Sequence, residues 1–483
     1  MVSQMTFPST IVYGNDAVAW RTEQARTRIW SSPAREMLVQ YLDAVRVCYQ
    51  TKGNWKQVPY RYYLQVQSNF QQRWWNQSRP DMQKVHADWL VYGGCERQTE
   101  MRMMHRLVSA MLERGACLAY LVRFGSSEHE SLRPLAEQYP VQMKLVDLYH
   151  GLGADRRRLS AAAVQQAWQH FCVVNDLIGK ELRISERTFS FFLGAMARRM
   201  LWERLKPFLS YDRLLVRNHF GSLDSVIALD ALLAGKPVVT LQHGVISSSG
   251  FFPVLATTVL TFGRSSADFL KREDERFARW CNTSVYARSY IPVGSLFDEI
   301  HSVPEGFHYR TILLIDQYNP GASAFYGLEE AFRRLPEVVL EVARRVAGAR
   351  ITLRLHPSQK QLPGWVKDAS EDIIISQGRP LREDLACSTL AVGLFSGALT
   401  IAAASGVPTF FLWEPGWFYT PDLSCFANGN FVSAEEFVER AVACLTSRDA
   451  YQQERRLAMH NAEGYYAGGR QTDFELVVDE INR

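Results

Sequence analysis

The chain has 483 residues, of which 47% are hydrophobic and 22% charged, and it carries a formal net charge of +4. This composition is typical of a globular protein that buries large cores, and the length allows two or three domains. The charge excess is far smaller than that of a nucleic-acid-binding domain, so we expect no nucleic-acid partner.

Eight cysteines are scattered along the chain without any C-x-x-C pair. The sequence therefore gives no zinc or redox motif, and it favours a reducing compartment. The N terminus lacks a basic segment followed by an apolar core, and the uncharged stretch at residues 245–262 contains Pro253. Because no signal peptide is visible and this stretch is a poor membrane span, we expect a cytoplasmic protein.

The first 85 residues are expected to form helices rich in aromatic side chains, such as Tyr60, Phe70 and Trp74. One interpretation is a helical cap that packs on the domain behind it. The alternative is a surface for sugars or lipid headgroups, because aromatic faces stack on both.

Residues 86–300 follow a strand–helix–strand pattern. Short apolar runs predict strands at residues 89–92, 117–122, 214–216, 237–241, 259–262 and 290–293. Apolar residues spaced three or four apart between residues 101 and 111 predict a helix, and residues 160–208 are expected to be helical throughout. This alternation is typical of a mostly parallel sheet with helices on both faces.

A second pattern of this kind begins after residues 296–310, which we interpret as a linker. Its expected strands are at residues 311–315, 350–355, 391–394 and 407–412, with a helix at 329–346. We therefore predict an α/β protein with an N-terminal helical region (1–85), a first domain (86–300) and a second domain (301–483). Small-molecule sites concentrate in clefts between such domains.

Two strand ends in the second domain carry residues suited to a phosphate. Arg354 and His356 lie at the end of one expected strand, and Ser396 and Gly397 open a helical run directly after another. Ligands of open α/β sheets bind outside the carboxyl ends of strands, and a helix N terminus attracts phosphate. The alternatives are that Arg354 and His356 are ordinary surface residues and that Ser396 only caps its helix, although a cap and a phosphate ligand are compatible roles.

Two candidate catalytic residues lie at strand ends in the first domain. His243, in the Q-H-G turn, follows the strand at 237–241, and Asp224 follows the strand at 214–216. His243 is either a donor to an anionic centre or a loop histidine bonded to backbone. Asp224 is either a carboxylate able to act as base or nucleophile, or a cap of the next helix.

Glu414 follows the strand at 407–412, where it either bonds a ribose hydroxyl or takes part in plain loop packing. The sequence contains no D-x-D run, no G-x-x-x-x-G-K-[ST] loop and no H-E-x-x-H motif. We therefore expect neither a metal nor a cofactor. Charge on a leaving phosphate would then be stabilised by a helix terminus together with Arg354 and His356.

The order of the Q-H-G turn, the R-x-H-P strand end and the Ser-led helix start resembles bacterial GT-B glycosyltransferases of surface polysaccharides. Within that group the chain is similar to CMP-sugar enzymes, namely the retaining β-Kdo transferases of capsule, lipopolysaccharide and O-antigen and the polysialyltransferases. The likeness covers residues 86–465, and the stretch 395–408 (FSGALTIAAASGVP) is similar to their nucleotide-phosphate segment. It implies the GT-B fold, with two Rossmann-like domains facing a cleft, here preceded by the N-terminal helical region.

The resemblance implies a CMP-sugar donor, with Kdo favoured, and a bacterial surface glycan as the acceptor. By position, His356 and Ser396 would hold the nucleotide phosphate with Arg354 beside them. Asp224 would match the nucleophile of retaining β-Kdo transferases, with His243 assisting, while an inverting reaction in which a carboxylate deprotonates the acceptor stays open. A lipid-linked acceptor would also imply peripheral association with the inner face of the cytoplasmic membrane.

The sialyltransferase pattern has two hydroxyl residues at the helix start, where this chain has Ser396 and Gly397. One hydroxyl contact is therefore lost or replaced by a backbone N–H. In addition, the acidic catalytic motif of the polysialyltransferases does not align with this chain. Both points count against a sialyltransferase. CDP-glycerol glycerophosphotransferases of teichoic-acid synthesis share a similar outline, so transfer of a polyol phosphate from a CDP-linked donor is an alternative activity. A non-enzymatic alternative is a scaffold subunit of a polysaccharide assembly complex.

Overall fold

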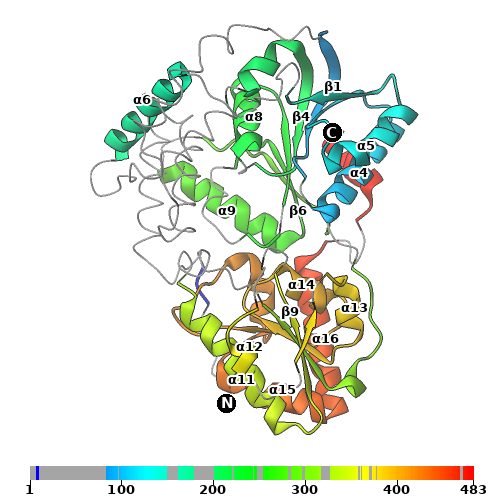
Figure 1. Ribbon diagram of the computed structural model, residues 1–483, viewed down its shortest axis with the longest axis vertical. Coiled ribbons are helices and arrows are strands. Elements are labelled where there is room, and N and C mark those ends of the chain that lie inside the picture. The colour runs from blue at the N-terminus through cyan, green and yellow to red at the C-terminus, as the bar shows by residue number, and fades with distance from the viewer. Residues whose placement is uncertain are drawn as a thin grey trace.

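The computed structural model of the protein shows two lobes, drawn one above the other in Figure 1. The structure describes residues 7–9, 83–95, 97–149, 161–178, 199, 201–219, 222–242, 244–246, 254–280, 284–295, 300–316, 327–356, 359, 362–368, 373–376, 378–467 and 472–482. The expected helices of residues 1–85, with Tyr60, Phe70 and Trp74, therefore lie almost entirely outside the described residues.

The first lobe is built on a seven-stranded sheet with the strand order β3-β2-β1-β4-β5-β6-β7. Its strands are β1 (Val85–Tyr92), β2 (Leu118–Val122), β3 (Met143–Asp147), β4 (Leu209–Val216), β5 (Val238–Leu241), β6 (Thr258–Thr261) and β7 (Ser289–Pro292). The strands pair in parallel throughout. Both β2 and β5 are buried along their whole length, as expected for apolar runs in a parallel sheet covered on both faces.

Helices cover both faces of this sheet (Figure 1). They are α4 (Gln98–Glu113), α5 (Ser127–Gln138), α6 (Ala161–Ile178), the short η4 (Lys206–Phe208), α8 (Ser222–Leu233) and α9 (Arg264–Trp280). Met104 and Leu107 of α4 belong to the core on one face, with Leu132 of α5. Ile227 of α8 and Phe269 of α9 belong to a separate core on the other face. The two cores hold the sheet between them as in other doubly wound α/β domains.

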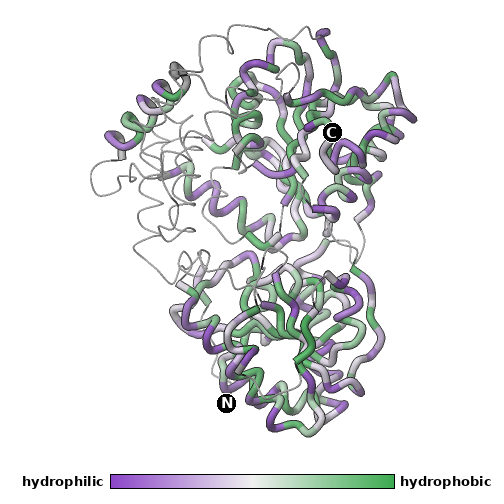
Figure 2. Tube along the Cα trace, viewed as in Figure 1, coloured by the Kyte–Doolittle hydropathy of each residue, from purple (hydrophilic) through white to green (hydrophobic). Residues whose placement is uncertain are grey.

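The second lobe is built on a six-stranded parallel sheet with the strand order β10-β9-β8-β11-β12-β13. Its strands are β8 (Thr311–Ile315), β9 (Arg350–Arg354), β10 (Ile373–Ser376), β11 (Leu390–Gly393), β12 (Thr409–Leu412) and β13 (Phe431–Val432). Hydrophobic residues gather along the strands of this lobe in Figure 2. Because β8, β11 and β12 are fully buried, they form the centre of the largest apolar core.

The helical elements of the second lobe surround this sheet. They are η6 (Phe307–Tyr309), α11 (Glu329–Arg345), α12 (Trp365–Asp368), α13 (Leu381–Ala386), α14 (Gly397–Ala404), η7 (Pro421–Ala427), α15 (Ala434–Thr446) and α16 (Arg448–Tyr465). The apolar side of α11, with Val338, Val339 and Val342, packs into the core, while its first turn carries acidic residues and its last turn basic ones. That charge order is favourable for the helix dipole.

The two sheets share one topology, which confirms the predicted fold class. In each sheet the first strand lies beside the fourth, because β1 pairs with β4 and β8 pairs with β11. The order reverses at this pair, so that each lobe has a topological switch point of the Rossmann type. Two Rossmann-like lobes in succession are the GT-B arrangement that the sequence resemblance implies.

The C-terminal helix α17 (Phe474–Asn482) returns to the first lobe. Its residues Glu475 and Asp479 form ion pairs with Arg114, at the end of α4, at 3.3 and 3.2 Å. Val477 and Val478 belong to the core beneath α4. The last helix of the predicted domain of residues 301–483 therefore packs on the other lobe, and the domain boundaries stay a prediction.

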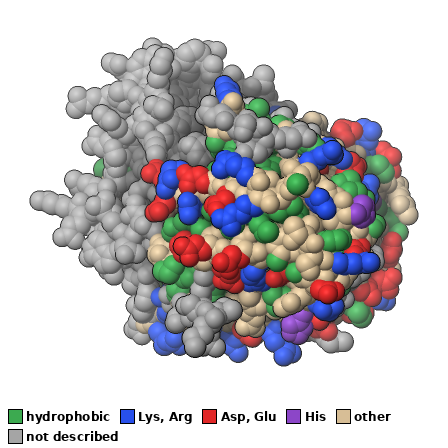
Figure 3. Space-filling view, turned by 90° about the horizontal axis from the view of Figure 1, so that it is seen from below, with side chains coloured by type: hydrophobic (Ala, Val, Ile, Leu, Met, Phe, Trp, Pro, Cys, Tyr) green, Lys and Arg blue, Asp and Glu red, His purple; other side chains and the backbone are tan. Residues whose placement is uncertain are grey.

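Charged side chains are mixed on the surface of the second lobe. Figure 3 views this lobe from below and shows Lys and Arg interspersed with Asp and Glu over its described part. None of the helices that the structure describes combines the length and the apolar character needed to cross a membrane.

Candidate functional site

The carboxyl ends of the two sheets meet at the junction between the lobes. After β5, the backbone N–H of Ile246 donates to Asp422 Oδ2 (2.8 Å), and the Ile246 carbonyl accepts from Thr420 Oγ1 (2.6 Å). After β6, a Cβ added to Gly263 would come within 2.2 Å of the Tyr465 carbonyl. Loops that follow strands in one lobe therefore face the other lobe, at the edges where parallel α/β sheets bind ligands.

His356 is half-buried just after β9, close to residues of both lobes. Burial and the positive charge of Arg97, before α4 in the first lobe, lower the pKa of His356, whereas Asp316, after β8, raises it. Gln359 links His356 to Asp316. Its backbone N–H donates to the His356 carbonyl (2.8 Å), and its side-chain amide donates to Asp316 Oδ2 (3.2 Å). A neutral imidazole here can both donate and accept a hydrogen bond. Neither Arg97 nor Asp316 was predicted from the sequence.

Ser396 caps α14, as one of the two interpretations of the sequence predicts. Its Oγ accepts from the Ala398 N–H (3.2 Å) and its backbone is extended. Ser396 and Gly397 are half-buried, and a Cβ added to Gly397 would meet no described atom within 4 Å. Among the described residues the N terminus of α14 therefore opens onto free space, where its first N–H groups and the helix dipole attract anions. Phosphate binding by Ser396 and Gly397 stays a prediction.

The Arg354 side chain donates hydrogen bonds to residues of its own lobe. Its Nη1 donates to Asp384 Oδ2 (2.5 Å) and to the Arg379 carbonyl (3.0 Å). Ser376 Oγ donates to the same carboxylate oxygen (2.6 Å), and the Asp384 side chain is completely buried. Removing Arg354 would leave the buried carboxylate with only the Arg379 guanidinium, whose Nε is 3.9 Å from Asp384 Oδ1, as a cationic partner, so the structure gives Arg354 a part in stability. A second role of Arg354 beside a phosphate stays a prediction.

Glu414 is half-buried after β12 and serves the backbone of its own lobe. Its Oε1 accepts from the Ala434 N–H (2.8 Å), the first residue of α15. Ser433 caps the same helix by accepting from the Glu436 N–H. These contacts account for Glu414 by loop and helix packing, and a contact with a ribose stays a prediction.

Asp224 lies in the first turn of α8, which follows β4 at the switch point of the first sheet. Only 6% of its surface is exposed, and its Oδ1 has no hydrogen-bond partner among the described residues. Burial raises the pKa of Asp224 to about 7, against the opposing effect of Arg217. Near neutral pH the carboxyl group therefore exists in both forms, which suits a base or a nucleophile. Asp224 thus lies in the helix that follows β4, and its catalytic role stays a prediction.

A largely buried polar network, which the sequence did not reveal, acts on this carboxylate through the charges of Arg217 and Glu128. Arg217, directly after β4, donates to the carbonyls of Gly93 (2.8 Å) and Gly94 (3.3 Å) and pairs with Glu100 Oε1 (2.7 Å). Alongside it, Tyr120 OH donates to Glu128 Oε1 (2.8 Å). Position 93 requires glycine, because a Cβ there would lie 2.1 Å from the Tyr120 hydroxyl.

Burial raises the pKa of Glu128, while Arg217 lowers it, so that Arg217 favours the ionised form of both Glu128 and Asp224. The charge also acts in the other direction, because Glu128 raises the pKa of Asp224. The sequence signal for this network is that Gly93 and Arg217 directly follow two neighbouring strands.

His243 lies outside the described residues, so its catalytic role stays a prediction. The residues on either side of it are described. Gln242 is buried, its side chain donates to the Gly244 carbonyl (3.1 Å), and its Oε1 accepts from the Phe262 N–H (2.7 Å). The turn is thus tied to the loop after the neighbouring strand β6.

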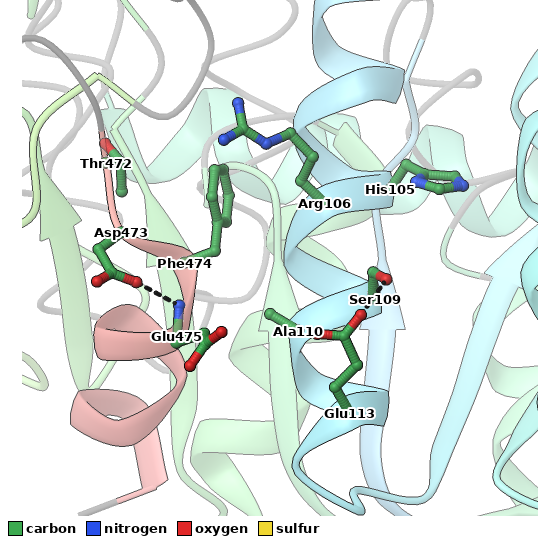
Figure 4. Close-up of a pocket in the computed structure, with 9 residues that line it drawn as sticks. All are labelled: His105, Arg106, Ser109, Ala110, Glu113, Thr472, Asp473, Phe474 and Glu475. Carbon is green, nitrogen blue, oxygen red and sulfur yellow. Dashed lines mark hydrogen bonds between the residues drawn. The ribbon is translucent and has the colours of Figure 1, made fainter.

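A hollow of about 600 Å³ lies elsewhere, between α4 and the start of α17 (Figure 4). Its polar lining includes His105, Arg106 and Glu475, and none of the predicted site residues lines it. Across the part of the chain that the structure describes, no group of three or more His, Cys, Asp or Glu side chains is placed to hold a metal ion. The hollow therefore adds nothing to the site at the carboxyl ends.

A scan against models of known protein families finds no match. A search of curated proteins finds none either. Solved structures similar to this chain include a UDP-N-acetylglucosamine 2-epimerase from Neisseria meningitidis bound to UDP-GlcNAc, with 12% identity and a TM-score of 0.45 over 82% of this chain and 99% of that one.

Two further solved structures are similar to a comparable extent. MurG from Acinetobacter baumannii has 12% identity and a TM-score of 0.41, covering 82% of this chain and 99% of that one. HepE from Anabaena, in complex with UDP and glucose, has 11% identity and a TM-score of 0.44, covering 82% and 98%. Similarities at this level of identity and TM-score assign no activity and no substrate to the chain.

Proposed function

We propose that the protein is a glycosyltransferase that transfers a sugar from a nucleotide-activated donor to a glycan acceptor. The observation that carries this proposal is the pair of loops at the carboxyl ends of β9 and β11. There, His356 is close enough to Arg97 of the first lobe and to Asp316 of its own lobe for both charges to act on its pKa, and Ser396 starts a helix whose first residue, Gly397, has open space before it among the described residues. Such an arrangement is suited to a phosphate that carries a leaving group.

In the proposed complex the nucleotide binds to the second lobe. Its phosphate accepts hydrogen bonds from the N–H groups at the start of α14 and from Ser396 and His356. The backbone of Gly397 can approach a phosphate closely, since no described atom lies within 4 Å of a Cβ at that position. Glycine at such a point allows the phosphate to reach the helix N terminus directly.

The proposed chemistry takes place at Asp224 in the first lobe. The ionised Asp224 attacks the anomeric carbon as the bond from that carbon to the phosphate oxygen breaks, and the nucleotide leaves with the bonding electrons. An acceptor hydroxyl then attacks the same carbon, displaces the Asp224 carboxylate and passes its proton to the phosphate of the departing nucleotide, so the configuration is retained. Burial helps an attacking carboxylate by removing competing water, and it also raises the pKa of Asp224 to about 7.

Kdo carried by CMP is the donor that we favour within this class, and a bacterial surface glycan is the favoured acceptor. Both choices rest on the sequence resemblance of the Q-H-G turn, the R-x-H-P strand end and the stretch 395–408. The proposal needs no metal, because the helix terminus and His356 supply the stabilisation of the leaving phosphate.

The first test is the thermal stability of the purified protein with CMP, CDP, UMP, UDP and GDP in turn. A ligand that binds only the folded protein raises the melting temperature by mass action. A shift with CMP alone supports a CMP-sugar donor, and a shift with UDP or GDP keeps the glycosyltransferase proposal but replaces the donor. If no nucleotide shifts the melting temperature, the scaffold alternative is favoured instead.

A second test separates sugar transfer from transfer of a polyol phosphate. CMP is released in both reactions, so the acceptor product must be weighed by mass spectrometry. A mass increase equal to Kdo supports the proposal. An increase equal to a polyol phosphate would replace it with a CDP-dependent phosphotransferase.

A further inference from the structure

A single buried carboxylate joins the two lobes. Asp422, in η7 of the second lobe, is completely buried, and both of its oxygens accept hydrogen bonds. Ser266 Oγ donates to Oδ1 at 2.5 Å, whereas the Ile246 N–H (2.8 Å) and Tyr465 OH (2.9 Å) donate to Oδ2. Two of these three donors, Ser266 and Ile246, belong to the first lobe.

Neighbouring contacts reinforce this connection. Ser265 Oγ donates to the Asp422 carbonyl (2.9 Å), and Thr420 Oγ1 donates to the Ile246 carbonyl (2.6 Å). Ser265 and Ser266 lie in the first turn of α9, after β6, whereas Ile246 follows β5. Two adjacent loops at the carboxyl edge of the first sheet are thus held by one short segment of the second lobe.

Burying a carboxylate costs desolvation free energy, which is offset only where the carboxylate accepts well-aligned hydrogen bonds. Burial raises the pKa of Asp422 to about 6, and hydrogen bonds from Ser266, Ile246 and Tyr465 oppose that effect. An apolar side chain of similar size would avoid the desolvation but would make none of these directional contacts. The Asp422 carboxylate therefore fixes the position of the Ile246 backbone relative to η7 more closely than apolar packing alone would.

The segment held in this way leads directly into the predicted site. Ile246 is the last described residue of the turn that begins at Gln242, and Gln242 is itself bonded to the Phe262 N–H beside α9. Both ends of the described turn are therefore fixed by hydrogen bonds. The end at Ile246 is fixed by the lobe that carries Ser396 and His356.

We propose that Asp422 is a positioning residue, which holds the turn through Gln242, Gly244 and Ile246 in register with the donor-binding loops of the second lobe. This inference rests on the proposed function. The nucleotide would bind without Asp422, but the sugar would not be aligned with the groups of the first lobe. A displacement of about 1 Å at a reacting centre costs roughly 10²-fold in rate.

The central test compares Asp422→Ala with Asp422→Asn. Asparagine can accept from the Ile246 N–H and the Tyr465 hydroxyl through its oxygen and donate to Ser266, whose hydroxyl also accepts. We expect Asp422→Ala to lower kcat for CMP release from CMP-Kdo at least about tenfold, with the Kd for CMP within about twofold of wild type. Asp422→Asn should retain most of the wild-type kcat.

Tyr465→Phe is the matched control, because it removes a hydrogen bond to the same carboxylate from within the second lobe. It should lower the melting temperature without the loss of kcat. Ser266→Ala removes a donor of the first lobe and should lower kcat, and it replaces Asp422→Ala if that variant fails to fold. Equal kcat losses in Tyr465→Phe and Ser266→Ala, or wild-type kcat in Asp422→Ala and Ser266→Ala, would overturn the inference.

Amide hydrogen exchange gives a readout that does not depend on activity. In Asp422→Ala, or in Ser266→Ala if Asp422→Ala does not fold, the peptide covering residues 241–246 should exchange at least about tenfold faster, while β12 keeps its wild-type protection. If the wild-type protein releases nucleotide from no CMP-, UDP- or GDP-sugar, the proposed function fails, and exchange alone then decides whether Asp422 holds the turn. Unchanged exchange at residues 241–246 would show that it does not.

Discussion

Asp224 and Ser396 occupy corresponding positions in the two lobes. Asp224 lies in the first turn of the helix that follows β4, and Ser396 caps the helix that follows β11. The strands β4 and β11 are in turn the direct partners of the first strand of each sheet. Each of the two predicted residues therefore lies at the switch point of its own sheet, where ligands of doubly wound sheets bind.

The two positions differ in what they offer a ligand. The start of α14 is half-buried and uncharged, with free space before Gly397, which suits an incoming anion. The start of α8 already holds a carboxylate that is almost wholly buried. In the proposed reaction the start of α14 binds the leaving group, and Asp224 at the start of α8 supplies the nucleophile.

Asp224→Asn should abolish turnover and leave nucleotide binding intact. Without a nucleophile, we expect kcat to fall by about 10³-fold or more, as for other residues that act directly in covalent catalysis. CMP should still raise the melting temperature by the wild-type amount, because its proposed site is in the second lobe. The measurement is CMP release together with the thermal shift. Wild-type turnover in this variant would leave Asp224 as a residue of the helix start only.

The pH dependence of activity should follow the ionisation of Asp224. Burial raises the pKa of this residue to about 7, and only its ionised form is a nucleophile. The value of kcat/KM should therefore increase with pH, with its half-maximal value near pH 7 and a plateau above it. A profile that is flat between pH 5.5 and 8.5 would contradict this role.

Stability should change with pH in the opposite direction. The pKa of Asp224 rises from 3.8 to about 7 on folding, so between these values the folded protein holds a proton that the unfolded chain has released. The free energy of unfolding then decreases as the pH rises through this window. By the conversion of pKa shift to free energy, the effect is at most about 4 kcal/mol. Melting temperatures measured from pH 4 to pH 8 should show a flatter profile for Asp224→Asn than for wild type.

The sequence predicted most strands of both sheets because these strands are continuous apolar runs. The expected strands at 214–216, 237–241 and 311–315 occur as part of β4, as β5 (which begins one residue later, at Val238) and as β8. The strand β3 was missed because two of its five residues are charged, and α9 because its 17 residues are mostly polar on the outer side. Amphipathic elements at the edge of a fold depend on tertiary contacts, which a local pattern does not contain.

The sequence could place Asp224 and Ser396 in the fold because each of them follows one predicted strand, whereas their roles stay predictions. Partners from distant parts of the chain were not predictable. Asp422 and Ile246 are 176 residues apart, and their contact depends on how the lobes pack. Likewise, Arg354 was predicted beside a phosphate, whereas its observed partner Asp384 comes from α13, a helix that the sequence pattern did not predict.

Arg354→Ala and His356→Ala should have different effects, although the residues are neighbours in sequence. Loss of Arg354 leaves the buried Asp384 carboxylate with only the half-exposed Arg379 as a cationic partner, at 3.9 Å, and we expect a destabilisation of up to about 3–5 kcal/mol. Loss of His356 should leave the melting temperature close to wild type but weaken CMP binding by about tenfold or more, the effect of one hydrogen bond to a charged group. Denaturant unfolding and CMP titration of both variants measure the two effects.

The double variant Arg354→Ala/Asp384→Ala is the control for this pair. It removes both charges and should recover part of the stability that Arg354→Ala loses. If Arg354→Ala instead keeps wild-type stability and weakens CMP binding, Arg354 belongs with the phosphate rather than with Asp384.

Gly397→Ala should weaken nucleotide binding without harming the fold. A Cβ at this position meets no described atom within 4 Å, so the methyl group is accommodated and the free energy of unfolding should change by less than about 1 kcal/mol. The same methyl group would occupy the space through which a phosphate approaches the start of α14, and we expect CMP affinity to fall about tenfold or more.

Gly364→Ala is the matched control, because a Cβ there is equally unobstructed and no site residue lies beside it in sequence. CMP titration and thermal unfolding of both variants test the prediction. Equal CMP affinity in Gly397→Ala and wild type would show that the phosphate does not bind at this helix, and a loss in Gly364→Ala as large as in Gly397→Ala would show that the effect is not local.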